Sequence, residues 1–179
     1  MGRFSRGRAA DRGAAALEFA LVVPLLAVLV FGMIDYGLFF TDSLGARDGA
    51  RVAARDASVE HFVGAYPDGY GSSGDAQLMQ FACEAVDQTS AIGGDSYVKV
   101  WMPHGWIPGE SLMVCVAVVE NGLTGLTPMP NNSTVRARLV VRIEQGPDGA
   151  DSSSLTAEAK RTSAVEPLNL WDNWCNEPS

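Results

Sequence analysis

The chain contains 179 residues, of which 47% are hydrophobic and 19% are charged, so it has room for one modest folded domain and an anchor. Its formal net charge of -8 at pH 7 argues against a nucleic-acid partner, because phosphate binding needs clustered lysine and arginine side chains. The charge is unevenly placed, with +3 on residues 1–13 and -9 on residues 41–179. The two ends of the chain therefore differ in sign.

A long apolar run extends from Leu17 to Phe40 and is interrupted only by Glu18 and Asp35. As a helix it would extend for about 36 Å, which exceeds the roughly 30 Å hydrocarbon core of a bilayer. We therefore predict a transmembrane helix over residues 14–40. A bend is expected near Pro24, because proline lacks a backbone donor and clashes with the preceding turn.

The residues before this helix are basic and glycine-rich and show no hydrophobic periodicity, so residues 1–13 are predicted to form a disordered cytoplasmic leader. Four arginines precede the apolar run, and the positive-inside rule then places the N-terminus in the cytoplasm and the rest of the chain outside. A secretory signal, cleaved before Ala46, is the competing interpretation. It fits less well, because a typical signal has an apolar core of only about 7–15 residues. Under either interpretation the bulk of the chain lies outside the cytoplasm.

The helical pattern continues outside the membrane over residues 41–60, with small side chains on one face and arginines on another. Gly45 and Gly49 begin a series of small residues spaced by four, which continues with Ala53 and Ala57. Such a face allows close approach of a helix from a neighbouring subunit. The alternative is an ordinary amphipathic helix that packs on its own domain, and both interpretations remain open at this point.

Residues 61–179 are expected to form a small external domain. Residues 66–75 have the composition of a loop, and Asp75 is placed to cap a helix over residues 76–92. Valine-rich or alternating stretches predict four strands, of which the last has the weakest pattern: residues 96–102, 110–119, 135–145 and 155–165. The predicted fold class is α+β, with a long N-terminal transmembrane helix, one further helix, and an antiparallel sheet of three or four strands.

The side chains that carry catalysis or bind metals do not form a recognisable pattern. The two histidines, His61 and His104, lie in unrelated loop contexts, and no histidine and cysteine spacing matches a zinc site. The stretch GSSGD at residues 71–75 lacks the strand-turn-helix context of a nucleophile elbow. We therefore nominate no catalytic, cofactor-binding or metal-binding residue, expect that the protein is not an enzyme, and keep a secreted enzyme as a distant option.

Three cysteines, Cys83, Cys115 and Cys175, fall in the predicted external part, where disulfides persist. Because the number is odd, at most one intramolecular pair can form. We expect Cys83 with Cys115, a bond that would join the second helix to the sheet, with Cys175 as the rival for either partner. The two tryptophans beside Cys175, Trp171 and Trp174, are expected to dock the C-terminal tail on the domain.

The residues around the start of the apolar run resemble a known pattern. RGAAALE, from Arg12 to Glu18, is similar to the type IV prepilin signature, in which a dedicated aspartyl peptidase cuts after a glycine and a glutamate lies fifth in the mature chain. The longer stretch RGAAALEFALVVPLL, with FGMIDYG at its end, resembles the TadE-like minor pilin (pseudopilin) family of the tight-adherence (Tad/Flp) pilus systems. The distal VCVAVV and the C-terminal Trp-x-x-Trp-Cys are similar to versions from high-GC Gram-positive bacteria, the actinobacterial type.

This resemblance implies cleavage between Gly13 and Ala14 by a prepilin peptidase, and assembly with other pilin or TadE-like subunits through the N-terminal helix. A carboxylate inside hydrocarbon costs about 2.5–3.5 kcal/mol, so it needs a partner or a place near the interface. Glu18 could pair with the new amine of a neighbouring subunit, and Asp35 with an arginine such as Arg47 of a neighbour, unless Asp35 simply reaches the interface.

The implied protein is a single-pass subunit in lipid, placed in the cell membrane or incorporated in a surface pilus, and it needs no cofactor. The alternative is a membrane-anchored binding module of the cell envelope that never polymerises.

Overall fold

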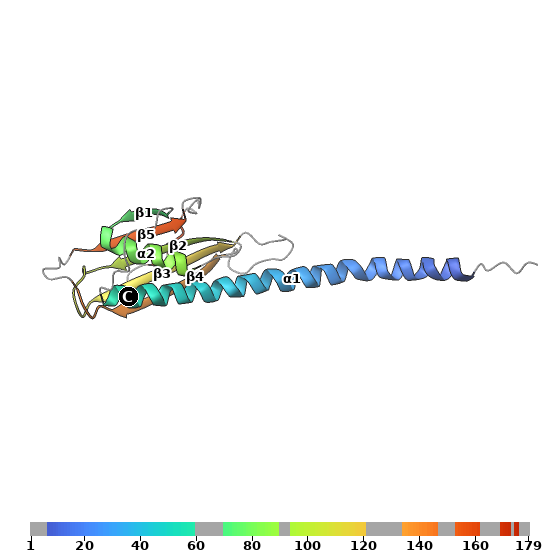
Figure 1. The fold of residues 1–179 in the computed structure, drawn as a ribbon, viewed down its shortest axis with the longest axis horizontal. Coiled ribbons are helices and arrows are strands. Elements are labelled where there is room, and N and C mark those ends of the chain that lie inside the picture. Colours follow the sequence, from blue (N-terminus) through green and yellow to red (C-terminus); the bar gives the residue numbers. More distant parts are fainter. Residues whose placement is uncertain are drawn as a thin grey trace, which may run out of the picture.

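The computed structural model describes residues 7–59, 70–89, 94–120, 134–146, 153–161, 169–172 and 174–175. A long helix, α1 (Gly7–Ser58), projects from one end of an α+β domain (Figure 1). At about 1.5 Å per residue its 52 residues extend for about 78 Å, so more than one third of its length lies beyond the domain. The α+β class and the long N-terminal helix are confirmed.

α1 begins earlier than expected and has no interruption. Gly7 to Gly13, part of the predicted disordered leader, belong to the helix, while residues 1–6 lie outside the described part of the chain. The helix passes through Pro24 and continues to Ser58, so the helical continuation outside the expected membrane segment is confirmed. Proline is tolerated there because it removes only one backbone hydrogen bond from a helix of this length.

The sheet has five antiparallel strands in the order β1-β5-β2-β3-β4, which is more than the three or four expected. The strands are β1 (Tyr70–Gly74), β2 (Gly94–Met102), β3 (Ser111–Glu120), β4 (Thr134–Arg142) and β5 (Leu155–Arg161). All four predicted strands are present, with small differences at their ends.

The additional strand, β1, lies in the segment predicted to be a loop. Its serine and glycine composition gave no strand signal, and its place in the sheet comes from backbone pairing with β5. Gly74 ends β1 with φ of +110°, and a Cβ there would lie 2.8 Å from Ala157 Cα. Only glycine combines that dihedral angle with such a close approach of two backbones.

The second helix, α2 (Ala76–Gln88), follows β1 directly. One carboxylate oxygen of Asp75 accepts hydrogen bonds from the backbone N–H of Gln77 at 2.9 Å and of Leu78 at 3.1 Å. The predicted N-cap is therefore confirmed. α2 ends at Gln88, before the expected residue 92, and the Thr89 hydroxyl donates to the Ala85 carbonyl at 2.6 Å.

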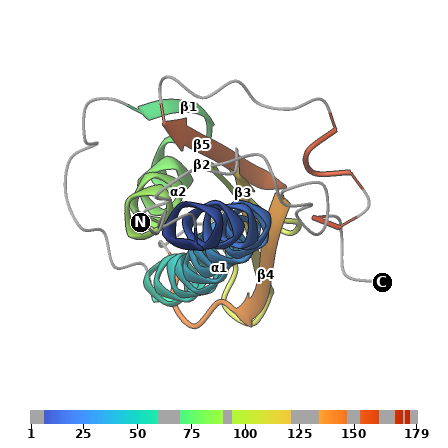
Figure 2. The same ribbon diagram turned by 90° about the vertical axis from the view of Figure 1, so that its right-hand side faces the viewer.

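Both helices pack on one face of the sheet. α1 contacts β3 and β4, and α2 contacts β5, β2 and α1, so that α2 and β4 lie on opposite sides of α1 (Figure 2). The main core lies between these layers and combines the alanine face of α1 with alternate residues of the strands. Trp106, the largest buried side chain, meets Phe81 of α2 edge to face with ring centroids 5.8 Å apart.

The C-terminal segment covers the other face of the sheet. Leu170, Trp171 and Trp174 pack on side chains such as Tyr97 of β2 and Ala117 of β3. The predicted docking of the tail is thus confirmed. Because β3 is covered on both faces, its side chains are buried in succession, which explains why its sequence is continuously apolar.

Candidate functional site

The part of α1 outside the domain is a solvent-exposed apolar stem, residues 13–34. Leu17, Phe19 and Leu21 are 66%, 70% and 72% exposed, and Glu18 is exposed among them. Among the described residues, α1 contains the one segment that is long and apolar enough to cross a membrane. The stem would extend for about 33 Å, close to the roughly 30 Å of a bilayer core. It is compatible with a single-pass membrane anchor.

The stem ends at Asp35, which is only 1% exposed while Ile34 and Tyr36 on either side remain accessible. From Asp35 onward one face of α1 is buried in its own chain, at positions that include Asp42, Ala46 and Ala50. The sequence placed Asp35 at the membrane interface or opposite an arginine of a neighbour. The structure instead places it where the domain begins, five residues before the expected end of the membrane segment.

A second buried carboxyl group, Asp42, forms a hydrogen bond with the Glu120 side chain at the end of β3. The two residues are 2% and 5% exposed. Three causes together raise the pKa of Glu120 to about 8: burial, which is the largest, then the hydrogen bond with Asp42, and the negative charge of Asp42. Near pH 7 Glu120 therefore keeps its proton, and the pair joins α1 to the sheet just above the stem.

Neither Asp42 nor Glu120 was singled out from the sequence. A signal was present in part, because Asp42 follows Asp35 by seven residues and so lies on the same helix face. Nothing in the sequence indicated that Glu120, the last residue of a valine-rich strand, would meet that face.

The series of small residues on α1 packs against its own domain. A Cβ on Gly49 would lie 2.9 Å from the Ala85 carbonyl oxygen and would collide with the Thr89 hydroxyl. Ala53 and Ala57 are fully buried. Of the two interpretations left open by the sequence, packing within the chain accounts for these positions. Gly45 differs, since a Cβ there would meet no atom within 4 Å.

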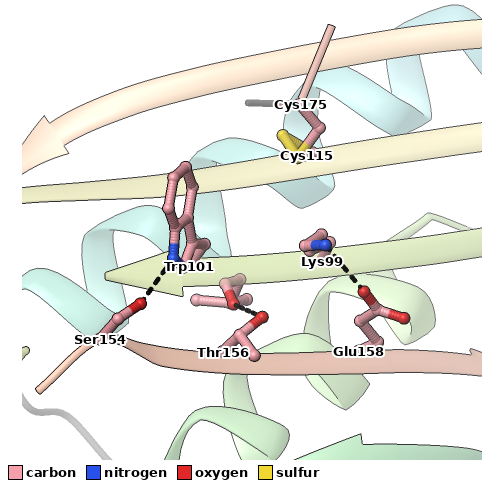
Figure 3. Close-up of polar contacts among 8 residues, drawn as sticks. Lys99, Trp101, Cys115, Ser154, Thr156, Glu158 and Cys175 are labelled. Carbon is pink, nitrogen blue, oxygen red and sulfur yellow. Dashed lines mark hydrogen bonds and ion pairs between the residues drawn. A yellow bond between two sulfur atoms is a disulfide. The ribbon is translucent and has the colours of Figure 1, made fainter. Parts of the chain in front are cut away.

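The disulfide joins Cys115 of β3 to Cys175 in the tail, with Cα atoms 6.0 Å apart (Figure 3). The expected pair of Cys83 with Cys115 is wrong. Cys83 is a buried free thiol on α2, and burial raises its pKa. The error has a simple geometric cause: Cys83 packs in the core on the helix side of the sheet, whereas Cys115 projects from the opposite face.

A groove of about 400 Å³ lies between α1 and β4. Four arginines line this arginine groove together with three apolar residues: Arg47, Arg51, Arg136, Arg138, Ala50, Ala137 and Leu139. Arg136 stacks over the Trp174 ring at 5.5 Å, and an Arg138 Nη atom donates to the Trp174 carbonyl at 3.3 Å. The side chains of Arg136 and Arg138 are therefore held over the tail face of the sheet, beside their cross-strand neighbours Ala117 and Cys115, so the positive charge on the α1 side of the groove comes from Arg47 and Arg51.

A second hollow, of about 490 Å³, lies near the end of β4 and includes His104, Glu110 and Ser111. It provides a base, an acid and a hydroxyl, but no hydrogen bond links the three side chains in the described structure. No group of three or more histidine, cysteine, aspartate or glutamate side chains among the described residues could hold a metal ion. His61 falls outside the described residues.

Comparison with known proteins gives one match. No curated protein and no solved structure matches the chain. The family model described as TadE-like protein matches residues 13–55, which cover the stem and the part of α1 that packs on the domain. The N-terminal helix is therefore similar to the TadE-like proteins, and this supports a relationship to that family.

Proposed function

We propose that this protein is a membrane-anchored subunit of a Tad-type pilus system, a minor pilin or pilus assembly protein, and that it assembles through its N-terminal helix. The observation that carries the proposal is the exposed apolar stem, continuous with a helix buried in the domain and contained in the segment that matches the TadE-like family. A stem of this kind can lie in a bilayer or pack against other stems. The role is structural, and we assign no catalytic residue.

The proposed topology places the N-terminus in the cytoplasm and the domain outside. The four arginines before the stem and the acidic character of residues 41–179 favour this orientation. A disulfide such as that between Cys115 and Cys175 persists in an oxidising environment, which agrees with an external domain.

We further propose that a prepilin peptidase cuts between Gly13 and Ala14. The cut would leave an amine at Ala14, four residues from the exposed carboxylate of Glu18. An amine and a carboxylate from neighbouring stems attract strongly in a low-dielectric environment, which would set the axial register of the packed helices. Actinobacterial membership is part of the same proposal and rests on the distal sequence stretches alone.

Intact-mass and N-terminal peptide mass spectrometry of the protein isolated from its own cells tests the processing step. The proposal expects a chain that begins at Ala14. A chain that retains the leader, or one that begins at Ala46, would contradict it, and the second result would show a cleaved secretory signal.

A second candidate function is a membrane-anchored binding module that never polymerises. The open arginine groove on the domain favours it, because a docking surface does not require assembly of stems. The two functions differ in what Glu18 does: a Glu18→Ala substitution leaves surface display and complex formation unchanged in a binding module, and reduces assembly in a pilus subunit.

A further inference from the structure

The cationic side chains of the domain are concentrated on one side. After residue 40 the chain has nine lysines and arginines against eighteen acidic residues. Six of the nine lie on α1 or β4: Arg47, Arg51, Arg55, Arg136, Arg138 and Arg142. Of the other three, Lys99 is paired with Glu158 at 3.0 Å (Figure 3). The rest of the domain is therefore strongly acidic, and the basic side of one copy complements the remainder of another.

The arginine groove is available for a partner. Arg47 forms no ion pair with any described residue, and the pair of Arg51 with Asp48 is 3.4 Å long and largely exposed, which makes it weak. In the described part of the chain β4 pairs with β3 alone, so the groove also borders the outer edge of the sheet. Charged side chains along an edge protect it from unspecific strand pairing, and they also select an acidic partner.

The opposite side of the domain carries α2, which contains acidic residues and no basic residue. Gln77, Glu84 and Asp87 recur at helical spacing, and Gln77 and Asp87 are exposed, whereas the side-chain oxygen of Gln80 is buried. Because Gly49 of α1 packs against Ala85 and Thr89, the last turn of α2 lies at the same level along α1 as Arg47 and Arg51. Figure 2, viewed along α1, shows α2 and β4 on its two sides.

Copies anchored in one membrane by the same helix share one orientation. When two such copies stand side by side at equal height, the outer face of α2 in one copy can face α1 and β4 of the next at the level of the groove. The contact uses two different patches, so it is heterologous and can repeat from copy to copy. A repeating contact of this kind fits a filament or a ring, and a self-complementary dimer would not use it.

We propose that the arginine groove of one copy docks the last turn of α2, with Glu84 and Asp87, of a second copy of this chain. This inference rests on the proposed function for the parallel orientation of the copies. The docking is ionic, so added salt weakens it, and it is separate from the contacts between stems.

Zero-length carbodiimide cross-linking of the full chain in bilayers identifies the contact. An Arg51→Lys variant keeps the charge and supplies an amine that the reagent can join to a carboxylate in direct contact. The expected product links the peptide that contains position 51 to the α2 peptide of another copy, as mass spectrometry of mixed isotopically labelled copies can show. The matched control is Arg142→Lys, on β4 but outside the groove, which should not link to α2.

Charge reversal, followed by rescue with a complementary variant, tests the same contact without a cross-linking reagent. Arg47→Glu with Arg51→Glu changes two exposed side chains, so the fold should survive, as an unchanged unfolding temperature would show. Association through the domains should fall about tenfold, which corresponds to about 1.4 kcal/mol. Mixing this variant with an Asp87→Lys copy should restore the association, because the reversed charges then attract each other.

Three results would overturn the inference. Copies that associate in the bilayer but give no link between position 51 and α2 would show that the domains meet elsewhere, while leaving the proposed function standing. A parent protein that shows no association between copies in the bilayer would contradict both the inference and the proposed function. Unchanged association after charge reversal would contradict the inference alone.

Discussion

Asp42 of α1 and Glu120 of β3 form a hydrogen bond between two buried carboxyl groups at the point where the stem enters the domain. One proton shared by two acids lets them lie together without mutual repulsion. Residues 121–133, which follow Glu120, contain no ionisable side chain. The junction between stem and domain should therefore depend on pH.

Glu120→Gln tests this dependence. The folded pKa of Glu120, about 8, lies above its ordinary value of 4.5, so the folded state binds the proton more tightly than the unfolded state. The contribution of Glu120 to stability is complete below about pH 4.5 and is lost as pH rises to about 8. Glutamine does not titrate, so the variant does not lose stability in this way. The free energy of unfolding of the variant, relative to that of the parent, should therefore increase between pH 5 and 8.

Urea unfolding of the full chain in detergent, followed by tryptophan fluorescence, measures this difference. Glu144→Gln removes an exposed carboxylate and is the control, with no trend expected. A difference between Glu120→Gln and the parent that stays constant from pH 5 to 8 would show that Glu120 titrates normally.

Two glycines on α1 should respond oppositely to the same substitution. Gly49→Ala places a methyl group against the backbone carbonyl of Ala85 and against Thr89, so α1 and α2 must move apart at a cost of about 1–3 kcal/mol. Gly45→Ala meets open space and should stabilise the helix by about 0.5–1 kcal/mol. Equal effects of the two substitutions on the free energy of unfolding would contradict the packing described between α1 and α2.

The disulfide should hold the tail on the sheet. Cys175→Ser opens a loop with a sequence separation of 60 residues and should lower the free energy of unfolding by about 2–5 kcal/mol. The substitution should also expose Trp174 to solvent. Limited proteolysis would detect the released tail, and a red shift of tryptophan emission would detect the exposed side chain. Cys83→Ala is the control, because its buried thiol forms no disulfide. If Cys83→Ala, and not Cys175→Ser, abolished the disulfide, the pairing would be wrong.

Much of the fold could be predicted from local patterns. The long helix, the Asp75 cap and the four valine-rich or alternating strands all follow from hydrophobic periodicity and side-chain chemistry within short windows. β1 could not be predicted, because its Gly-rich residues enter the sheet through backbone pairing with β5, which lies far away in the sequence.

The relations between distant elements were harder to infer. The pairing of Cys115 with Cys175 depends on which face of β3 each neighbour covers. Three cysteines allow three different pairs, and their number alone does not indicate which pair forms. The packing of Gly49 on α2 and the meeting of Asp42 with Glu120 depend in the same way on tertiary placement. In contrast, the exposed stem with Glu18 was visible in the sequence because it lies in one continuous segment.

The most direct test of the central claim compares the amount of parent and Glu18→Gln protein recovered in filaments sheared from the cell surface, relative to the amount in the membrane. Glu144→Gln, which removes an exposed carboxylate from the domain, is the matched control. Assembly through the stem predicts that Glu18→Gln accumulates in the membrane and is depleted from the filaments, while Glu144→Gln behaves like the parent. Equal recovery of all three proteins in the filament fraction, or absence of the parent from it, would contradict assembly through the N-terminal helix.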